Sequence, residues 1–209
     1  MIPKILHHCW FGDAELPELA ISCLASWRWA MPDYRVMLWR DIDLPDLPYV
    51  QTALKNRKFA NVANYMRLCL LAEFGGVYMD TDVEAIRSFD SLLQDEMFLG
   101  WQQNGEINNA VIGAVPGHPL IQRGRDTLPE KHDGLEKANL SGPTLITDLV
   151  REHYDIQPQM VHELSRFAGL TVYPDRYFYP YWWTEQYDPA CLTDDTICVH
   201  HWAATWKRP

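Results

Sequence analysis

The stretch Gly75-Gly76-Val77-Tyr78-Met79-Asp80-Thr81-Asp82-Val83 decides the fold of this chain more than any other. The paired glycines are a strong stop for the helix expected over residues 61–74. Residues 77–79 then form a short apolar run, which is typical of a buried strand. Asp80 and Asp82 follow at the carboxyl end of that strand, where open α/β sheets bind ligands. The stretch therefore predicts a helix, a strand and an acidic turn that faces a ligand.

On either side of this stretch, expected strands alternate with expected helices. Residues 2–9 and 34–39 have the composition of strands, and residues 17–31 between them have apolar residues at helical spacing. This order predicts a parallel strand pair joined by a helix. Further elements are expected as short strands near residues 83–86, 98–101, 110–115, 171–173 and 196–200, and helices near 119–128 and 145–153. No internal repeat or linker interrupts the chain, so we expect one α/β domain over residues 1–209.

Composition and charge exclude several classes of protein. The 209 residues are 47% hydrophobic, enough to bury a core, and carry a formal net charge of −10. A nucleic-acid binder needs a basic face, which this sequence lacks. The five cysteines are odd in number and form no CxxC pair, which argues against a disulfide framework or a zinc ribbon.

Targeting signals are also not evident in the sequence. No apolar run approaches the roughly 18 residues of a transmembrane helix, and the N-terminus lacks the pattern of a signal peptide. The net charge disfavours binding to an anionic membrane surface. We therefore expect a cytoplasmic protein, with peripheral association with a membrane assembly complex left open.

The two aspartates favour a metal site but do not prove one. Carboxylates two residues apart on a turn can face one hard cation such as Mg²⁺ or Mn²⁺, although aspartate is also a common turn former. An EF-hand loop starting at Asp80 is excluded, because its sixth and twelfth positions are Ala85 and Ser91. A phosphatase with Asp80 as nucleophile is a weaker alternative, since the later Asp194-Asp195 pair precedes the last expected strand.

Blocks spread over nearly the whole chain give this motif its context. In order, they occupy residues 2–12 (IPKILHHCWFG), 26–27, 32–34, 59–68 (FANVANYMRL), 75–84 (GGVYMDTDVE), 108–114, 117–119, 141–143 and 200–206 (HHWAATW). Together they resemble glycosyltransferase family 32, whose sugar-binding region contains the DxD motif. Transferases of capsular polysaccharide synthesis and the catalytic core of clostridial glucosylating toxins are related to that family.

The resemblance implies a fold and an activity. The fold is the GT-A fold, in which helices flank a mixed, mostly parallel central sheet. The activity is transfer of a hexose, with retention of configuration, from a nucleotide-sugar donor to a hydroxyl of a glycan or glycolipid acceptor in polysaccharide biosynthesis. A UDP-sugar is the expected donor. The cofactor is Mn²⁺ or Mg²⁺. A non-catalytic carbohydrate- or nucleotide-binding protein on a degenerate transferase scaffold is the alternative.

The family also implies roles for residues around the motif. Trp10 stacks on the uracil of the donor, and Arg67 reaches the sugar and phosphate of the donor. Tyr78 lies near the donor. Asp80 holds hydroxyls of the ribose and the donor sugar, whereas Asp82 binds the metal directly.

Residues farther from the motif complete the implied site. Asn109 faces the donor sugar or the acceptor, His201 is a last metal ligand, and Trp206 packs on the diphosphate as a lid. The chain departs from the family at Asn64, where an aspartate is common, and at residues 204–205. Both departures touch the donor site, so the choice of donor sugar is open. We expect Asn64 to bind the substrate.

An aromatic segment lies near the C-terminus. Residues 173–187 include eight aromatic residues, Trp182 and Trp183 among them. They form either a wall for the acceptor or a packed hydrophobic cluster. The sequence leaves both interpretations open.

Overall fold

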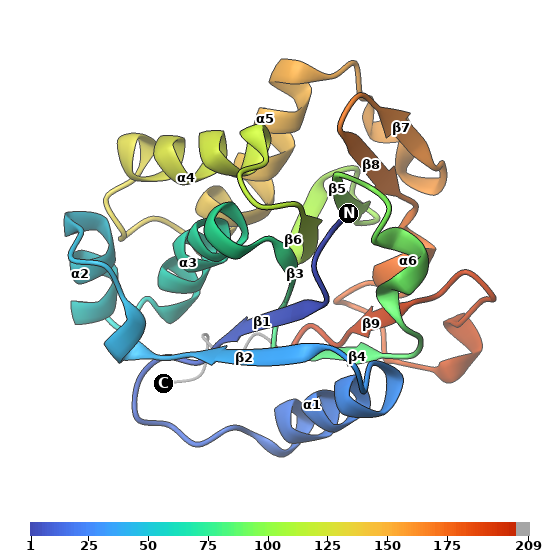
Figure 1. Ribbon diagram of the computed structural model, residues 1–209, viewed down its shortest axis with the longest axis horizontal. Coiled ribbons are helices and arrows are strands. Elements are labelled where there is room, and N and C mark those ends of the chain that lie inside the picture. Colours follow the sequence, from blue (N-terminus) through green and yellow to red (C-terminus); the bar gives the residue numbers. More distant parts are fainter. Residues whose placement is uncertain (204–209) are drawn as a thin grey trace.

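A computed structural model describes residues 1–203 of the chain. Most of the secondary structure belongs to a single central sheet with helices on both faces (Figure 1). The strands are β1 (Ile5–Cys9), β2 (Arg35–Trp39), β3 (Gly76–Met79), β4 (Val83–Ala85), β5 (Met97–Trp101), β6 (Ile107–Ala114), β7 (Ser165–Phe167), β8 (Leu170–Tyr173) and β9 (Cys198–His200). The helices are α1 (Glu18–Ala30), α2 (Pro48–Lys55), α3 (Phe59–Phe74), α4 (Pro119–Lys131), α5 (Leu145–His153) and α6 (Asp175–Phe178).

The central sheet has seven strands in the order β2-β1-β3-β6-β5-β8-β7. Strand β1 pairs in parallel with β2 and β3, and β5 pairs in parallel with β8. Strands β6 and β7 run against their neighbours, so five of the seven strands point the same way. The parallel β1–β2 pair and the mixed, mostly parallel sheet confirm the sequence prediction.

Two apolar clusters cover the two faces of the sheet. Helices α2 to α5 bury one cluster, in which Tyr78 of β3 packs with Leu68 and Leu71 of α3. Helix α1 lies on the opposite face, below β2 in Figure 1, and its Trp27 packs in the second cluster with Val77 and Met79 of β3. Successive residues of β3 therefore point to opposite faces, as the pleat of a strand requires.

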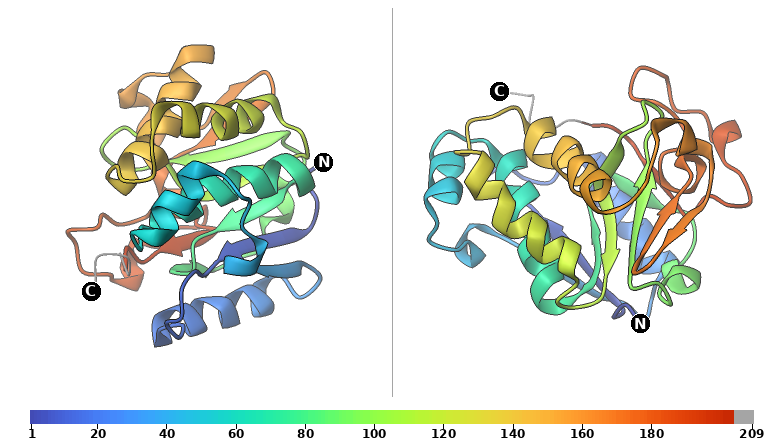
Figure 2. Two further views of the ribbon diagram at one scale, coloured as in Figure 1. Left: turned by 90° about the vertical axis from the view of Figure 1, so that its left-hand side faces the viewer. Right: turned by 90° about the horizontal axis from the view of Figure 1, so that it is seen from above.

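Helix α3 ends at the glycine pair that the sequence singles out. Gly75 and Gly76 have φ angles of 61° and 98°, in the left-handed region that favours glycine. A Cβ atom on Gly75 would lie 2.6 Å from Cδ of Pro116. The two glycines therefore allow a tight turn of the chain from α3 into β3. Figure 2 shows α3 and α4 side by side over the sheet, where they pack together.

A two-stranded sheet of β4 and β9 lies beside the central sheet. It is antiparallel and places Val83 opposite His200, so the end of the described chain returns to the DxD turn. Three elements were not predicted, namely α2, β7 and the short α6. Among residues 1–203, no helix combines the length and the hydropathy that a membrane crossing requires.

Candidate active site

The DxD turn is fixed at the end of β3 by backbone hydrogen bonds. The N–H of Asp80 donates to the carbonyl of Ala110 on β6 at 2.9 Å. The N–H of Val83 donates back to the carbonyl of Asp80 at 3.1 Å, which closes the turn before β4 begins. The two carboxylates are therefore held by a rigid sheet edge rather than by a loose loop.

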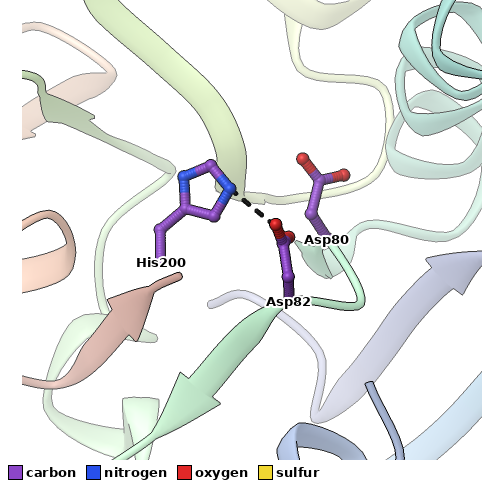
Figure 3. Close-up of side chains that lie close together, drawn as sticks. All are labelled: Asp80, Asp82 and His200. Carbon is purple, nitrogen blue, oxygen red and sulfur yellow. Dashed lines mark ion pairs between the residues drawn. The ribbon is translucent and has the colours of Figure 1, made fainter. Parts of the chain in front are cut away.

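Strand β9 brings a histidine to the two carboxylates. The N–H of His201 donates to the carbonyl of Asp82 at 2.9 Å, which sets the register between β9 and the turn. His200 then directs its Nε2 atom to Oδ1 of Asp82, 3.3 Å away. Asp80, Asp82 and His200 each offer a ligand atom within 4.8 Å of the others (Figure 3). These three residues form the acidic cluster of the site.

Burial and charge act in opposite directions on this cluster. Burial raises the pKa of Asp80, and the negative charge of Asp82 raises it further, against the opposing effect of Arg67. Burial also works to raise the pKa of Asp82, but His200 and the N–H of Ala203 outweigh it and hold this pKa below its usual value. Burial lowers the pKa of His200, yet Asp82 more than offsets this, so the net shift is upward. A cation between these groups would relieve the repulsion between the carboxylates.

The donor set fits a divalent metal ion. Carboxylate oxygens are the ligands that Mg²⁺ and Mn²⁺ prefer, and an imidazole suits Mn²⁺ better than Mg²⁺. The buried Nδ1 atom of His200 has no hydrogen-bond partner among residues 1–203. The Nε2 atom of the same ring faces Oδ1 of Asp82 at 3.3 Å and is the atom placed to bind an ion. Asp80, Asp82 and His200 are therefore suited to hold the ion.

Arg67 on α3 supports the first aspartate from the opposite side. Its Nη2 atom lies 3.1 Å from Oδ1 of Asp80, and Nη1 donates to the carbonyl of Asn109. Its Nε atom donates to the carbonyl of Ala63 at 3.2 Å, and its guanidinium lies 4.4 Å from the ring centroid of Tyr78. These contacts orient the guanidinium toward Asp80 and assign Arg67 a role in positioning that carboxylate.

The prediction for His201 needs correction. The sequence places the last metal ligand at His201, but the structure places the neighbouring His200 at the acidic cluster. The Nε2 atom of His201 instead lies 2.9 Å from Oε2 of Glu84, and its Nδ1 atom lies 3.3 Å from the hydroxyl of Tyr181. The two side chains diverge because successive residues at a strand end point in different directions.

Asn64 and Asn109 lie in a buried amide network. Nδ2 of Asn109 donates to Oδ1 of Asn64 at 2.9 Å. Nδ2 of Asn64 donates to the carbonyl of Ala138 at 2.9 Å and to the hydroxyl of Ser141 at 3.2 Å. Asn64 is only 5% exposed, and its amide faces the 138–141 segment. A direct contact with the donor, expected from the sequence, is not supported by this geometry.

The remaining predicted residues lie in three different settings. Trp10 follows β1, is partly exposed, and donates from Nε1 to the carbonyl of Ala14 at 2.6 Å. Tyr78 is buried beneath Arg67, and burial raises its pKa well above the usual value. Trp206 lies outside the described residues, as do residues 204–205.

Sequence reasoning missed His200 and the partners of Asn64. Adjacent histidines give no local signal of which one faces the cluster, because that depends on the β4–β9 register. The expected strand over residues 196–200 was the available clue, since His200 closes it. Ser141 is singled out in the sequence only within the block over residues 141–143, and Ala138 carries no chemical signal, because its contribution is a backbone carbonyl.

Part of the sequence matches a described protein family. Residues 17–99 match the family described as glycosyltransferase sugar-binding region containing DXD motif. Inositol phosphoceramide mannosyltransferase 3 of Schizosaccharomyces pombe is 31% identical over 135 residues, which are 61% of this chain and 37% of that protein. The human alpha-1,4-N-acetylglucosaminyltransferase is 31% identical over 68% of this chain and 41% of its own. The chain thus spans about two fifths of the length of these relatives.

Solved structures share the fold. PaToxG glycosyltransferase superposes with a TM-score of 0.62 at 18% identity, over 72% of this chain and 69% of its own. The glycosyltransferase domain of the YGT toxin gives a TM-score of 0.51 at 12% identity, over 82% and 80% of the two chains. These likenesses show the GT-A fold that was expected. Residues 17–99 in addition match the glycosyltransferase sugar-binding region that contains the DXD motif.

Proposed function

We propose that the protein transfers a hexose from a UDP-linked sugar to a hydroxyl of a glycan or glycolipid acceptor, with Mn²⁺ or Mg²⁺ as cofactor. The observation that carries this proposal is the convergence of Asp80, Asp82 and His200 at the edge of the sheet. Arg67 lies directly behind this cluster and fixes Asp80. The family match of residues 17–99 supplies the class of reaction.

The residues of the chain divide the work of binding the donor. Asp82 and His200 would hold the ion, which would supply positive charge for the diphosphate of the donor. Asp80, braced by Arg67, is placed to accept hydrogen bonds from donor hydroxyls. Trp10 offers an indole face to the uracil. Because the protein carries a net charge of −10, a cation is needed to bring a dianionic diphosphate to two carboxylates.

The transfer step requires one bond to form and one to break. The acceptor oxygen attacks the anomeric carbon from the face that the diphosphate vacates, and the bond from that carbon to the diphosphate oxygen breaks. The proton of the acceptor hydroxyl passes to the leaving diphosphate. The configuration at the anomeric carbon is retained because attack and departure occur on the same face.

A panel of nucleotide sugars with detection of released UDP tests this proposal. We expect UDP release with Mn²⁺ from at least one donor, loss of release in EDTA, and recovery when Mn²⁺ is restored. Full activity in excess chelator would contradict the role of the metal. No UDP release from any donor, with or without a sugar acceptor, would favour a binding protein instead.

Metal binding measured without substrate tests the ligand assignment separately. Titration of Mn²⁺ by electron paramagnetic resonance should show weaker binding for His200→Gln than for His201→Gln. These two variants are matched, because the same substitution is made at adjacent positions. A larger loss for His201→Gln would mean that the sequence prediction was correct and that the register of β9 differs in solution.

A further inference from the structure

The aromatic segment over residues 173–187 divides into a core half and a surface half. Its first members pack inside, and Phe178 and Tyr179 are fully buried. Its later members reach the surface, where Trp183 is 59% exposed and Trp182 and Tyr187 are partly exposed. The two interpretations left open by the sequence therefore apply to different parts of the segment. Trp202, which follows β9, contacts this surface group. We call Trp182, Trp183, Tyr187 and Trp202 together the aromatic shelf.

The aromatic shelf begins next to the acidic cluster. The ring of Trp202 lies 4.2 Å from that of His200, measured between centroids. Trp182 meets Trp202 edge to face at 5.5 Å, and Trp183 follows at 6.3 Å from Trp182. The shelf therefore leads outward from the acidic cluster without a break, and any group bound on it would lie next to the place where the diphosphate must leave.

The backbone at Trp202 is held in an unusual shape that keeps its ring in place. Trp202 has a φ angle of 53°, which is uncommon for a bulky residue. Its Nε1 atom donates to the carbonyl of Tyr181 at 3.0 Å, and the next N–H, of Ala203, donates to Oδ2 of Asp82 at 2.8 Å. Strained residues of this kind persist where surrounding contacts over-determine them, and they cluster at ligand sites. Asp82 of the acidic cluster therefore also holds the backbone next to Trp202 in place.

Polar groups border the aromatic shelf. The ring of Tyr187 meets that of His201 edge to face at 4.9 Å. His201 in turn pairs with Glu84 at 2.9 Å, and the Glu84 side chain remains 37% exposed. Flat aromatic faces match the C–H faces of a pyranose ring, and a part-exposed carboxylate beside them matches its hydroxyls. A hydrocarbon tail would gain nothing from this polar border.

We propose that the aromatic shelf binds a neutral hexopyranose ring of the acceptor, with the part-exposed carboxylate of Glu84 as a hydrogen-bonding partner of its hydroxyls. This inference rests on the proposed function, because the shelf adjoins the cluster that holds the diphosphate. It assigns the acceptor to glycans, or glycolipids recognised by their sugar. The net charge of −10 agrees with a neutral rather than an acidic sugar.

Saturation-transfer NMR with lactose and with methyl α-D-mannopyranoside tests the inference on the whole protein in the presence of Mn²⁺ and UDP. We expect at least one of these sugars to bind, and Trp183→Ala to raise its dissociation constant at least tenfold. Trp183→Phe keeps a ring and should restore most of the affinity. Trp29→Ala is the matched control, because Trp29 is 79% exposed on α1 and lies outside the shelf. This variant should bind the sugar as the unchanged protein does.

Several results would overturn the inference. Binding of neither sugar would exclude it, as would equal affinity in Trp183→Ala or an equal loss in Trp29→Ala. A loss of UDP affinity in Trp183→Ala with sugar affinity unchanged would assign the shelf to the donor. Failure of the proposed function is recognised independently, because the unchanged protein would then release no UDP from any donor while its sugar binding could still be measured.

Discussion

The ion pair between Arg67 and Asp80 is a strong point at which to test the site, because both groups are mostly enclosed. The Arg67 side chain is 4% exposed and that of Asp80 is 29% exposed. Replacing Arg67 with methionine preserves much of its volume but leaves Asp80 without its cation. It also leaves the carbonyls of Asn109 and Ala63 without the donors they have now.

The expected loss of stability follows from this enclosure. Removing one partner of a buried ion pair costs about 3–5 kcal/mol, because the other charge stays buried without compensation. Water can still reach part of Asp80, so we expect the lower end, about 3 kcal/mol, after allowance for screening. For a chain of this size each kcal/mol moves the melting temperature by about 2–4 °C, which gives a fall of roughly 6–12 °C.

Circular dichroism melting without divalent ions measures the effect, and a double-mutant cycle isolates the pair. Arg67→Met, Asp80→Asn and the double variant should give a coupling energy of about 2 kcal/mol, since contacting residues do not act additively. Arg125→Met is the control, because Arg125 pairs with Asp126 on the surface and should hardly move the melting temperature. Additive effects of the Arg67 and Asp80 variants would refute the reasoning, as would a fall equal to that of the control.

Three further predictions concern single residues. Asp82→Asn should slow UDP release with Mn²⁺ by about 10²-fold, equivalent to roughly 3 kcal/mol; near-normal initial rates would mean that the motif is only a turn. Trp10→Ala should weaken UDP binding by about 1–3 kcal/mol in calorimetry, and unchanged affinity in a folded variant would reject base stacking. Asn64→Asp should lower the free energy of unfolding in urea by about 1–3 kcal/mol, because it removes the donor to the carbonyl of Ala138. Unaltered urea stability would show that the amide network is dispensable.

The elements nearest the DxD motif could be predicted because their signals are local. Gly75 and Gly76 mark the end of α3 without reference to any other part of the chain, and their positive φ angles explain why. The short apolar run after them is typical of a buried strand, and it forms β3. By contrast, α2 begins with Pro48, which fits a loop as well as a first helical turn. Strand β7 has three residues and exists through its pairing with β8.

The sequence singles out Asp80, Asp82 and Arg67 by residue type, whereas the histidine that faces them depends on strand register. Asp80, Asp82 and Arg67 converge as residue types that suit a diphosphate and its cation. The choice between His200 and His201 depends on which residue of β9 lies opposite Val83, a long-range pairing that no local pattern encodes. The adjacent histidines have opposite surroundings for this reason alone.

The neutral amide of Asn64 affects the charge balance around Arg67, and an aspartate at this position would change it. Asn61 and Asn64, one helical turn apart on α3, both donate to carbonyls of the segment that crosses the helix, at Gly134 and Ala138. A carboxylate at position 64 could not donate to Ala138, and it would lie on the same helix face as Arg67 and attract its charge away from Asp80. The neutral amide of Asn64 instead joins that segment to the side chain of Asn109. The backbone carbonyl of Asn109 in turn accepts a hydrogen bond from Arg67. Holding this network neutral leaves the positive charge of Arg67 for the carboxylate at the end of β3.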